Sequence, residues 1–169
     1  MERVVVPDGG NVNAYTGAFF RVPDENGYVM DLASQSIGLG LAEGIGAAVA
    51  RPDRLPVVAT GDGSLLMNIV ELETAMRLGL GLLVVVYNDN AYGAEIHIFH
   101  DVEERDIVRF PDTDIAAIAR GYGCDAITVR ALRDLEPLRD WLAGPRNRPF
   151  VIDAKIEGFP SPVMELDMH

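Results

Sequence analysis

The sequence is poor in cysteine, in long apolar runs and in positive charge. Its single cysteine, Cys124, excludes a disulfide framework and a metal site made of several thiolates, and it suits a reducing compartment. No run of 18 apolar residues is present, and the apolar stretch near the N-terminus ends at Pro7, so neither a membrane span nor a signal peptide is expected. We therefore expect a cytoplasmic protein with no membrane partner.

Acidic residues outnumber basic ones by 26 to 14, which gives a net charge of −12 at pH 7. Because nucleic acids attract clustered Lys and Arg side chains, no nucleic-acid partner is expected. Hydrophobic residues make up 49% of the 169 positions, which is enough for the core of one ordinary domain. No linker, internal repeat or low-complexity segment interrupts the chain, so we expect one domain over residues 1–169.

Apolar runs of strand length alternate with segments of helical periodicity. Strands are expected at residues 4–6, 28–32, 55–60, 80–87, 127–129 and 150–155, and helices at 37–50, 66–78, 114–122 and 135–142. This alternation predicts a single three-layer α/β domain with a mostly parallel central sheet flanked by helices. In the glycine-rich helix, Leu39, Ala42, Gly46 and Val49 share a stripe that we expect to pack closely. Cys124 and Trp141 are expected in the core.

The first unusual turn is the segment TGDGS, residues 60–64, between a predicted strand and a predicted helix. Glycines let the backbone approach a ligand closely, and free amides at a helix start attract phosphate. Asp62 would repel phosphate unless a cation lay between them, so the segment indicates a carboxylate holding Mg²⁺ that bridges to phosphate oxygens. The alternative is a tight turn in which Asp62 caps the helix.

The second turn is YNDNAYG, residues 87–93, at the end of the most apolar strand. Asn88, Asp89 and Asn90 offer oxygens suited to a hard cation, although the same residues are common in ordinary turns. The 24 residues between Gly63 and Asn88 hold one predicted helix and one predicted strand. The two turns should therefore end sequential parallel strands at one edge of the sheet, within reach of one ion.

Together these motifs resemble the signature of thiamine-diphosphate-dependent enzymes: G-D-G, about 25 residues, then N-N or N-D. Residues 68–75, NIVELETA, resemble the N-x-x-E-L-x-T-A helix of the acetolactate synthase, benzoylformate decarboxylase and pyruvate decarboxylase group. The resemblance covers roughly residues 4–155. It implies a thiamine diphosphate-binding fold, the cofactors thiamine diphosphate and Mg²⁺, a small 2-oxo acid substrate and a homo-oligomer.

The resemblance also implies residue roles. Asp62, Asp89 and the Ala91 carbonyl would bind Mg²⁺, and Asn88 would brace the turn. Ile37 would be the apolar wedge under the cofactor, unless it is a core residue at a helix start, and Gln35 would offer its carbonyl to the aminopyrimidine. The full cofactor-binding set is Gly10, Asn11, Gln35, Ile37, Gly61, Asp62, Gly63, Ser64, Asp89, Ala91, Tyr92 and Gly93.

This chain departs from the family in two ways. Asp89 stands where the family usually has an asparagine; because carboxylates bind Mg²⁺ well, the metal site should survive. The glutamate that acts on the aminopyrimidine belongs to a separate pyrimidine-binding domain in this family, and no second domain is evident here; Glu71 and Glu73 belong to the helix after the G-D-G turn. We therefore expect a diphosphate-binding half that needs a pyrimidine-binding partner and is inactive alone.

Glu95 and His97 follow the second turn and are candidates for proton transfer. The alternative is the polar edge of a surface helix near residues 94–100. Two other assignments stay open: a small subunit of a split decarboxylase of the sulfopyruvate or phosphonopyruvate type, and a non-catalytic module that binds phosphate through Mg²⁺. The module is disfavoured, since no G-x-G-x-x-G with a following acidic residue is present.

Overall fold

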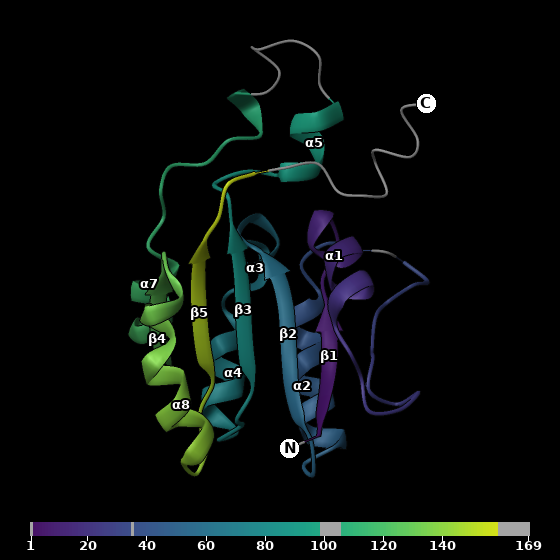
Figure 1. Ribbon diagram of the computed structural model, residues 1–169, viewed down its shortest axis with the longest axis vertical. Helices are drawn as coiled ribbons and strands as arrows, with labels where there is room; N and C mark the ends of the chain where they lie inside the picture. The colour runs from purple at the N-terminus through teal and green to yellow at the C-terminus, as the bar shows by residue number, and fades with distance from the viewer. Residues whose placement is uncertain (1, 35, 99–105, 159–169) are drawn as a thin grey trace.

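The computed structural model describes residues 2–34, 36–98 and 106–158 of the chain. In these residues a five-stranded sheet has the order β1-β2-β3-β5-β4, and every pair of neighbours is parallel (Figure 1). The strands are β1 (Arg3–Pro7), β2 (Leu55–Gly61), β3 (Leu83–Asn88), β4 (Asp125–Val129) and β5 (Phe150–Lys155). Because all strands point the same way, their carboxyl ends meet at one edge of the sheet, the upper edge in Figure 1.

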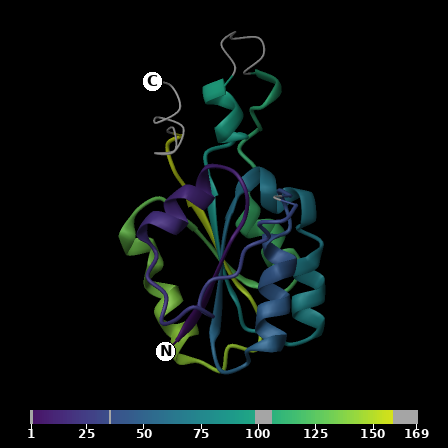
Figure 2. The same cartoon turned by 90° about the vertical axis from the view of Figure 1, so that its right-hand side faces the viewer.

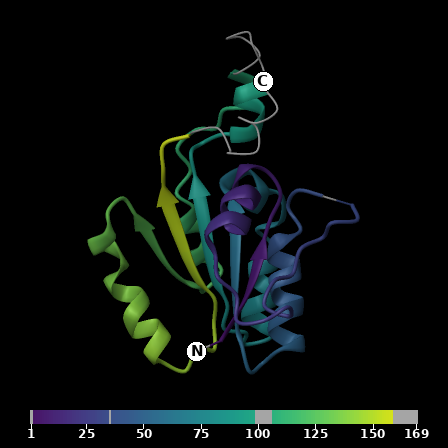
Figure 3. The same cartoon turned by 45° about the vertical axis from the view of Figure 1, so that its right-hand side comes forward.

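Helices cover both faces of the sheet, which makes three layers (Figure 2). One face carries α2 (Gly40–Ala50), α3 (Asp62–Asn68), α4 (Glu71–Arg77) and α7 (Ile115–Gly121), and the other carries α1 (Asn11–Phe19) and α8 (Glu136–Ala143), which follows the short 3₁₀ helix η1 (Leu132–Leu135). Helix α5 (Gly93–Ile98) lies beyond the carboxyl ends of the strands (Figure 3). The predicted α/β fold class is confirmed. No described helix has the length and apolar character to span a membrane.

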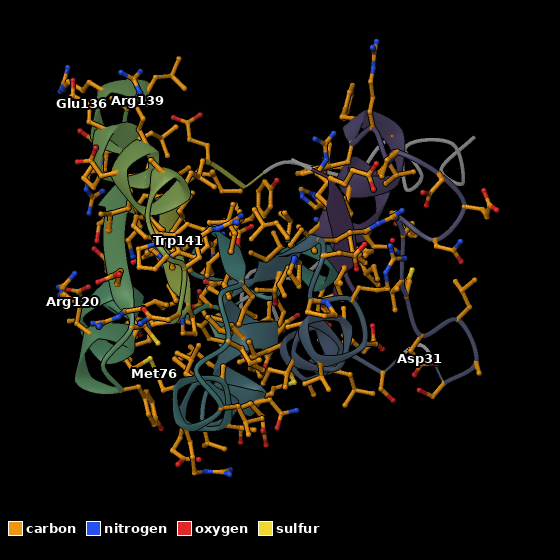
Figure 4. All side chains as sticks on the ribbon, turned by 90° about the horizontal axis from the view of Figure 1, so that it is seen from below. Asp31, Met76, Arg120, Glu136, Arg139 and Trp141 are labelled. Atoms are coloured by element: carbon orange, nitrogen blue, oxygen red, sulfur yellow. The ribbon has the colours of Figure 1, made fainter. Side chains whose placement is uncertain are left out.

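Side chains that alternate along each strand build two cores, one on each face. The larger core joins Val58, Val84 and Val151 to α2, α4 and α7, and it includes the buried Cys124, as expected. On the other face Trp141 of α8 packs against Phe150, with ring centroids 5.5 Å apart. Figure 4 shows Trp141 pointing from α8 toward the sheet, whereas Glu136 and Arg139 point away from it.

Two predicted elements are corrected, and one helix was missed. Residues 28–32 form no strand, since Tyr28 makes only an isolated bridge to Val5. The helix expected at 66–78 is two helices, α3 and α4, and α3 begins at Asp62, directly after β2. The helix α1 was not predicted; its only buried residues are Val12 and Thr16, so it lacks the apolar period that marks a helix in sequence.

The buried stripe of α2 also differs from the prediction. Leu41, Gly44, Ile45 and Ala48 face the sheet, whereas Val49 of the predicted stripe is 61% exposed. The reason is the approach of α2 to β2: a Cβ at Gly44 would lie 2.2 Å from the Val58 side chain. A helix with small residues on several sides has little hydrophobic periodicity in its sequence. The side that can pack most closely against the sheet is then the side that faces it.

Candidate functional site

The ends of β1, β2 and β3 border a cavity of about 280 Å³. Parallel pairing of β2 with β3 sets Gly61 opposite Tyr87, so the two polar turns are neighbours, as their spacing predicts. Every described residue of the predicted cofactor-binding set lines the cavity: Gly10, Asn11, Ile37, Gly61, Asp62, Gly63, Ser64, Asp89, Ala91, Tyr92 and Gly93. Gln35 lies outside the described residues.

Asp62 is the first residue of α3 and is only 3% exposed. Its Oδ1 accepts a hydrogen bond of 2.9 Å from the Gly63 N–H. Burial, with a smaller contribution from the charge of Asp89, raises the pKa of Asp62 to about 6. The cap position is held by Gly61 and makes no side-chain cap hydrogen bond, so the alternative of Asp62 as a simple helix cap does not describe this turn.

The turn after β3 is held by its own side chains. Asn88 is 1% exposed, and its Oδ1 accepts a hydrogen bond of 3.2 Å from the Asn90 N–H. Asn90 adopts a left-handed conformation with φ of 57°, which places Asp89 and Ala91 on either side of the bend. Burial raises the pKa of Asp89 as well. The turn thus brings a second carboxylate to the edge of the sheet that carries Asp62.

The two turns pack directly on each other at Gly63. A Cβ at Gly63 would lie 2.6 Å from the Tyr92 ring and 2.9 Å from the Phe110 ring. These two rings meet edge to face, with centroids 4.6 Å apart. Two backbone hydrogen bonds hold the rings in place, from Tyr92 N–H to Val108 O at 2.9 Å and from Phe110 N–H to Asn90 O at 2.7 Å. The space between the two turns therefore has no room for a side chain at position 63.

Asp8, which was not predicted as a site residue, lies directly before Gly9 and Gly10 of the cavity lining. It follows β1 directly and is 3% exposed. Its carboxylate accepts hydrogen bonds from the Gly38 N–H at 2.9 Å, the Thr60 hydroxyl at 3.1 Å and the Gly40 N–H at 3.3 Å. Asp8 therefore ties the ends of β1 and β2 to the loop that carries Ile37. An aspartate directly after an apolar strand was the available signal, the same one that marks Asp62.

Ile37 lines the cavity and is 38% exposed, so it is not the core residue of the alternative interpretation. It rests on the first strand's turn, since a Cβ at Gly9 would lie 3.0 Å from Ile37 Cγ1. Its role as a wedge under the cofactor stays a prediction.

An apolar wall of the cavity was also missed. It consists mainly of α1 and the residue after it, with one residue beyond β5: Val12, Tyr15, Phe19, Phe20 and Ile156. The Tyr15 and Phe19 rings stack with centroids 6.3 Å apart, the spacing of residues four apart on a helix. Two aromatic residues at positions 15 and 19 were the signal that could have found this wall.

The two proton-transfer candidates lie on α5, which buries none of its residues. Glu95 lines the cavity, and His97 is not among its lining residues. His97 is nevertheless close enough to Asp89 for its charge to lower the pKa of that carboxyl, against the larger effect of burial.

The donor set suits a hard divalent cation. Asp62 is buried and Asp89 is half-buried, and desolvation raises the pKa of both carboxyls, which a bound cation would offset. No group of three or more Asp, Glu, His or Cys side chains gathers as a metal site in the described part of the chain. The remaining ligands of an ion here would therefore be backbone carbonyls, water or a bound phosphate, as is usual for Mg²⁺.

Comparisons with known proteins match most of the chain. Residues 8–154 match the family model described as thiamine pyrophosphate enzyme, C-terminal TPP binding domain. The alpha-keto-acid decarboxylase of Mycobacterium bovis (strain BCG / Pasteur 1173P2) is 34% identical over 143 residues, which cover 77% of this chain and 25% of that protein. The acetolactate synthase of Bacillus subtilis (strain 168) is 27% identical over 158 residues, covering 90% of this chain and 27% of that protein.

Among solved structures, the Rhodococcus jostii RHA1 thiamine diphosphate-dependent 4-hydroxybenzoylformate decarboxylase superposes with a TM-score of 0.77 at 23% identity, covering 95% of this chain and 30% of that chain. At that identity the likeness supports the fold. The chain spans about a quarter of the length of these curated relatives. The family match confirms the resemblance drawn from the G-D-G and N-D motifs, and with it the cofactor pair of thiamine diphosphate and Mg²⁺.

Proposed function

Since the chain belongs to the thiamine pyrophosphate enzyme family, whose C-terminal TPP-binding domain it matches over residues 8–154, we propose that it is the diphosphate- and Mg²⁺-binding half of an enzyme acting on 2-oxo acids. The observation that carries the proposal is the pair of carboxylates, the buried Asp62 and the half-buried Asp89, at the edge of a cavity lined by the glycines of three strand ends.

In this proposal Asp62, Asp89 and the Ala91 carbonyl hold Mg²⁺, and Gly10, Asn11 and Ser64 lie at the diphosphate. When bound, thiamine diphosphate supplies carbanion chemistry of its own at the thiazolium ring. The protein residues hold and orient it: Asp8 fixes the loop of Ile37 and Gly38, and Gly63 lets the second turn close on the first. Ile37 supports the cofactor from below, and the apolar wall of α1 keeps water away from one side of the cavity.

We also propose that the glutamate for the aminopyrimidine comes from outside these residues, either from another subunit or from another part of a longer chain. Glu71 and Glu73 lie on α4, away from the cavity lining, and Glu73 forms an ion pair of 3.0 Å with Arg77. Glu95 is the one glutamate among the described lining residues, and it stands next to the metal-binding turn. Without a pyrimidine-binding partner the chain should bind the cofactor weakly and catalyse nothing.

The names of the relatives support the substrate class, since they include an acetolactate synthase and an alpha-keto-acid decarboxylase. A homo-oligomer is part of the proposal. The outer side of α2 to α4 supports it, because Val49, Met67, Val70 and Leu78 are each 49% exposed or more and would be covered in an assembly.

The test is a calorimetric titration of the chain with thiamine diphosphate, with and without Mg²⁺, followed by turnover assays on pyruvate and benzoylformate. We expect binding that requires Mg²⁺, no turnover by the chain alone, and turnover when a pyrimidine-binding partner is added. Binding without Mg²⁺ would contradict the metal-bridge assignment, and robust turnover by the chain alone would contradict the half-site assignment. Light scattering across concentration tests self-association, and a strict monomer would count against it.

A further inference from the structure

We propose that Asp153 and Lys155, which lie on β5 outside the cavity lining, are positioning residues that fix the metal-binding turn through the side chain of Asn88. The inference rests on the proposed function, because it concerns how the turn is made ready for the ion. It adds two charged residues that no motif of the sequence selects.

The three side chains form a continuous chain of contacts beneath the turn. Asn88 Nδ2 donates a hydrogen bond of 2.8 Å to Asp153 Oδ1. The other oxygen, Asp153 Oδ2, lies 3.3 Å from Lys155 Nζ. Pairing of β3 with β5 sets Asn88 opposite Lys155, and the Ile156 N–H donates to Asn88 O at 3.0 Å. Both Asn88 and Asp153 are almost completely buried, at 1% and 0% exposed.

Lys155 is held from its other side as well. Its Nζ donates to Asp112 Oδ1 at 2.7 Å and to the Thr113 carbonyl at 3.0 Å. It is the single lysine in the sequence, and its side chain is 10% exposed. The ammonium group therefore has a fixed place next to Asp153.

The direction of each hydrogen bond follows from what each group can do. An ammonium group only donates, a carboxylate only accepts, and an amide does both. Lys155 pairs with Asp153 Oδ2 as an ion pair, and the carboxylate in turn requires that Asn88 present its NH₂ group. The Asn88 oxygen then faces the Asn90 N–H, the bond of 3.2 Å that closes the turn. A reversed amide would set its oxygen against the Asp153 carboxylate, two acceptors, and its NH₂ group against the Asn90 N–H, two donors.

The turn needs this support because Asn90 has a φ of 57°. A left-handed conformation at a residue other than glycine carries a cost and persists where the surroundings hold it. A buried ion pair contributes little net stability compared with apolar residues of similar volume. Its presence in the otherwise apolar strand β5 is therefore better explained by the orientation that it gives Asn88 than by its contribution to stability.

The main test is Asp153→Asn in the full chain, with two readouts. The substitution barely changes volume, but its new NH₂ group must face either Asn88 or Lys155, and both are donors. We expect the Asn90 amide to exchange with solvent about tenfold faster, and the affinity for Mn²⁺, the probe for the metal site, to fall about tenfold, the range typical of residues that orient metal ligands.

The matched control is Asp125→Asn, the same chemical change at the exposed start of β4, at the opposite end of the sheet. It should change both readouts less than twofold, about the scatter expected for a distant surface charge.

A double variant, Asn88→Asp with Asp153→Asn, tests for rescue. It exchanges donor and acceptor at unchanged net charge, so the amide can donate to the new carboxylate while accepting from Lys155. The carboxylate at position 88 can still accept from the Asn90 N–H. Both readouts should return to within about threefold of the unmodified chain, because the pattern of donors and acceptors is complete again. Near-UV circular dichroism checks that each variant is folded.

The outcomes separate this inference from the proposed function. Unchanged Asn90 exchange in Asp153→Asn, or a double variant no better than the single one, overturns the inference. If Asp153→Asn does not fold, the double variant decides: exchange like that of the unmodified chain supports the inference, and fast exchange overturns it. If the unmodified chain does not bind Mn²⁺, or Asp62→Ala binds it equally well, the proposed function fails, and Asn90 exchange alone decides the positioning role.

Discussion

The two ends of the sheet each carry a cavity, and they differ in what lines them. The cavity at the carboxyl ends measures about 280 Å³ and contains Asp62 and Asp89, whose pKa values burial raises. The cavity at the amino ends of β4 and β5 is larger, about 570 Å³, but none of its charged residues is buried, and Arg120, Asp125 and Arg148 are exposed. Exposed charges are solvated and cost little, whereas buried carboxylates without a counter-charge indicate a ligand. Uncompensated buried charge, rather than size, therefore distinguishes the candidate site.

The largest expected effect is the loss of a metal ligand. Asp62→Ala should weaken Mg²⁺-dependent binding of thiamine diphosphate by about 10³-fold, because it removes the buried carboxylate that pairs with the ion in the proposed site. Asp89→Ala should have a similar effect, while Asp89→Asn should be better tolerated, since an amide oxygen can still coordinate the ion. Isothermal titration calorimetry measures these affinities.

The control for these variants is Asp140→Asn, at the opposite cavity, which should leave the affinity unchanged. Unchanged affinity in both alanine variants would contradict the assignment of Asp62 and Asp89 as metal ligands. It would also leave the two ends of the sheet without the proposed difference in ligand binding.

The next effect is the contribution of Asp62 to the pH dependence of stability. Its pKa rises from 3.8 to about 6 on folding, so the folded chain binds this proton more tightly than the unfolded chain. The folded state therefore loses stability as the pH rises from about 4 to about 6, by roughly 3 kcal/mol, and the loss levels off above that range. Urea unfolding of the unmodified chain and of Asp62→Asn at a series of pH values isolates the contribution as a difference.

Addition of Mg²⁺ and thiamine diphosphate above pH 6 should restore most of the lost stability, because the ion compensates the carboxylate. If the difference in free energy of unfolding between the two chains does not vary with pH, Asp62 ionises normally. The contrast between its buried charge and the exposed charges of the other cavity would then be wrong.

A smaller effect is expected at the contact between the two turns. Gly63→Ala brings a Cβ to 2.6 Å from the Tyr92 ring, so the rings must move, at a cost of about 2 kcal/mol in the free energy of unfolding. The matched control is Gly46→Ala on the exposed side of α2, where a Cβ meets nothing within 4 Å. That change should stabilise by about 0.5–1 kcal/mol, since alanine favours a helix. Equal effects of the two substitutions in thermal unfolding would contradict the packing described here.

The smallest effect concerns the opposite cavity. Cys124 lines it but is only 5% exposed, and burial raises the pKa of its thiol to about 11. Because the thiolate is the reactive form, labelling by a disulfide reagent at pH 8 should be at least about tenfold slower in the folded chain than in urea. Rapid labelling of the folded chain would show that the reagent reaches the Cys124 thiol, and it would contradict the burial described for this cavity.

The sequence predicts the placement of the two polar turns better than it predicts the helices around them. Asp62 and Asp89 stand out because each follows an apolar strand, and the single helix and strand between them bring both turns to one edge. The orientation of α2 could not be predicted, because glycine and alanine lie on several of its faces and only the contact of Gly44 with Val58 selects one. Helix α1 could not be predicted either, since two buried side chains give no period.

The partners of buried polar side chains could not be predicted either. Asp153 stands in the apolar run FVIDAK, where a sequence gives no sign of the partner that makes its burial possible. That partner is Asn88, 65 residues earlier in the chain, and only the pairing of β3 with β5 brings them together. Asp8 likewise finds its partners 30 and 52 residues later, at Gly38 and Thr60. Contacts of this kind depend on topology, which local sequence pattern does not contain.

The same long separations set the order in which the parts of the site can form during synthesis. Loop closure over 65 residues is slow compared with the formation of local structure, and the Asn88–Asp153 bond closes such a loop. A nascent chain that has emerged only as far as α7 already contains both proposed metal carboxylates, but it lacks β5 and the side chains that orient the second turn. The second turn therefore takes its described form late, once β5 has been made and has paired with β3.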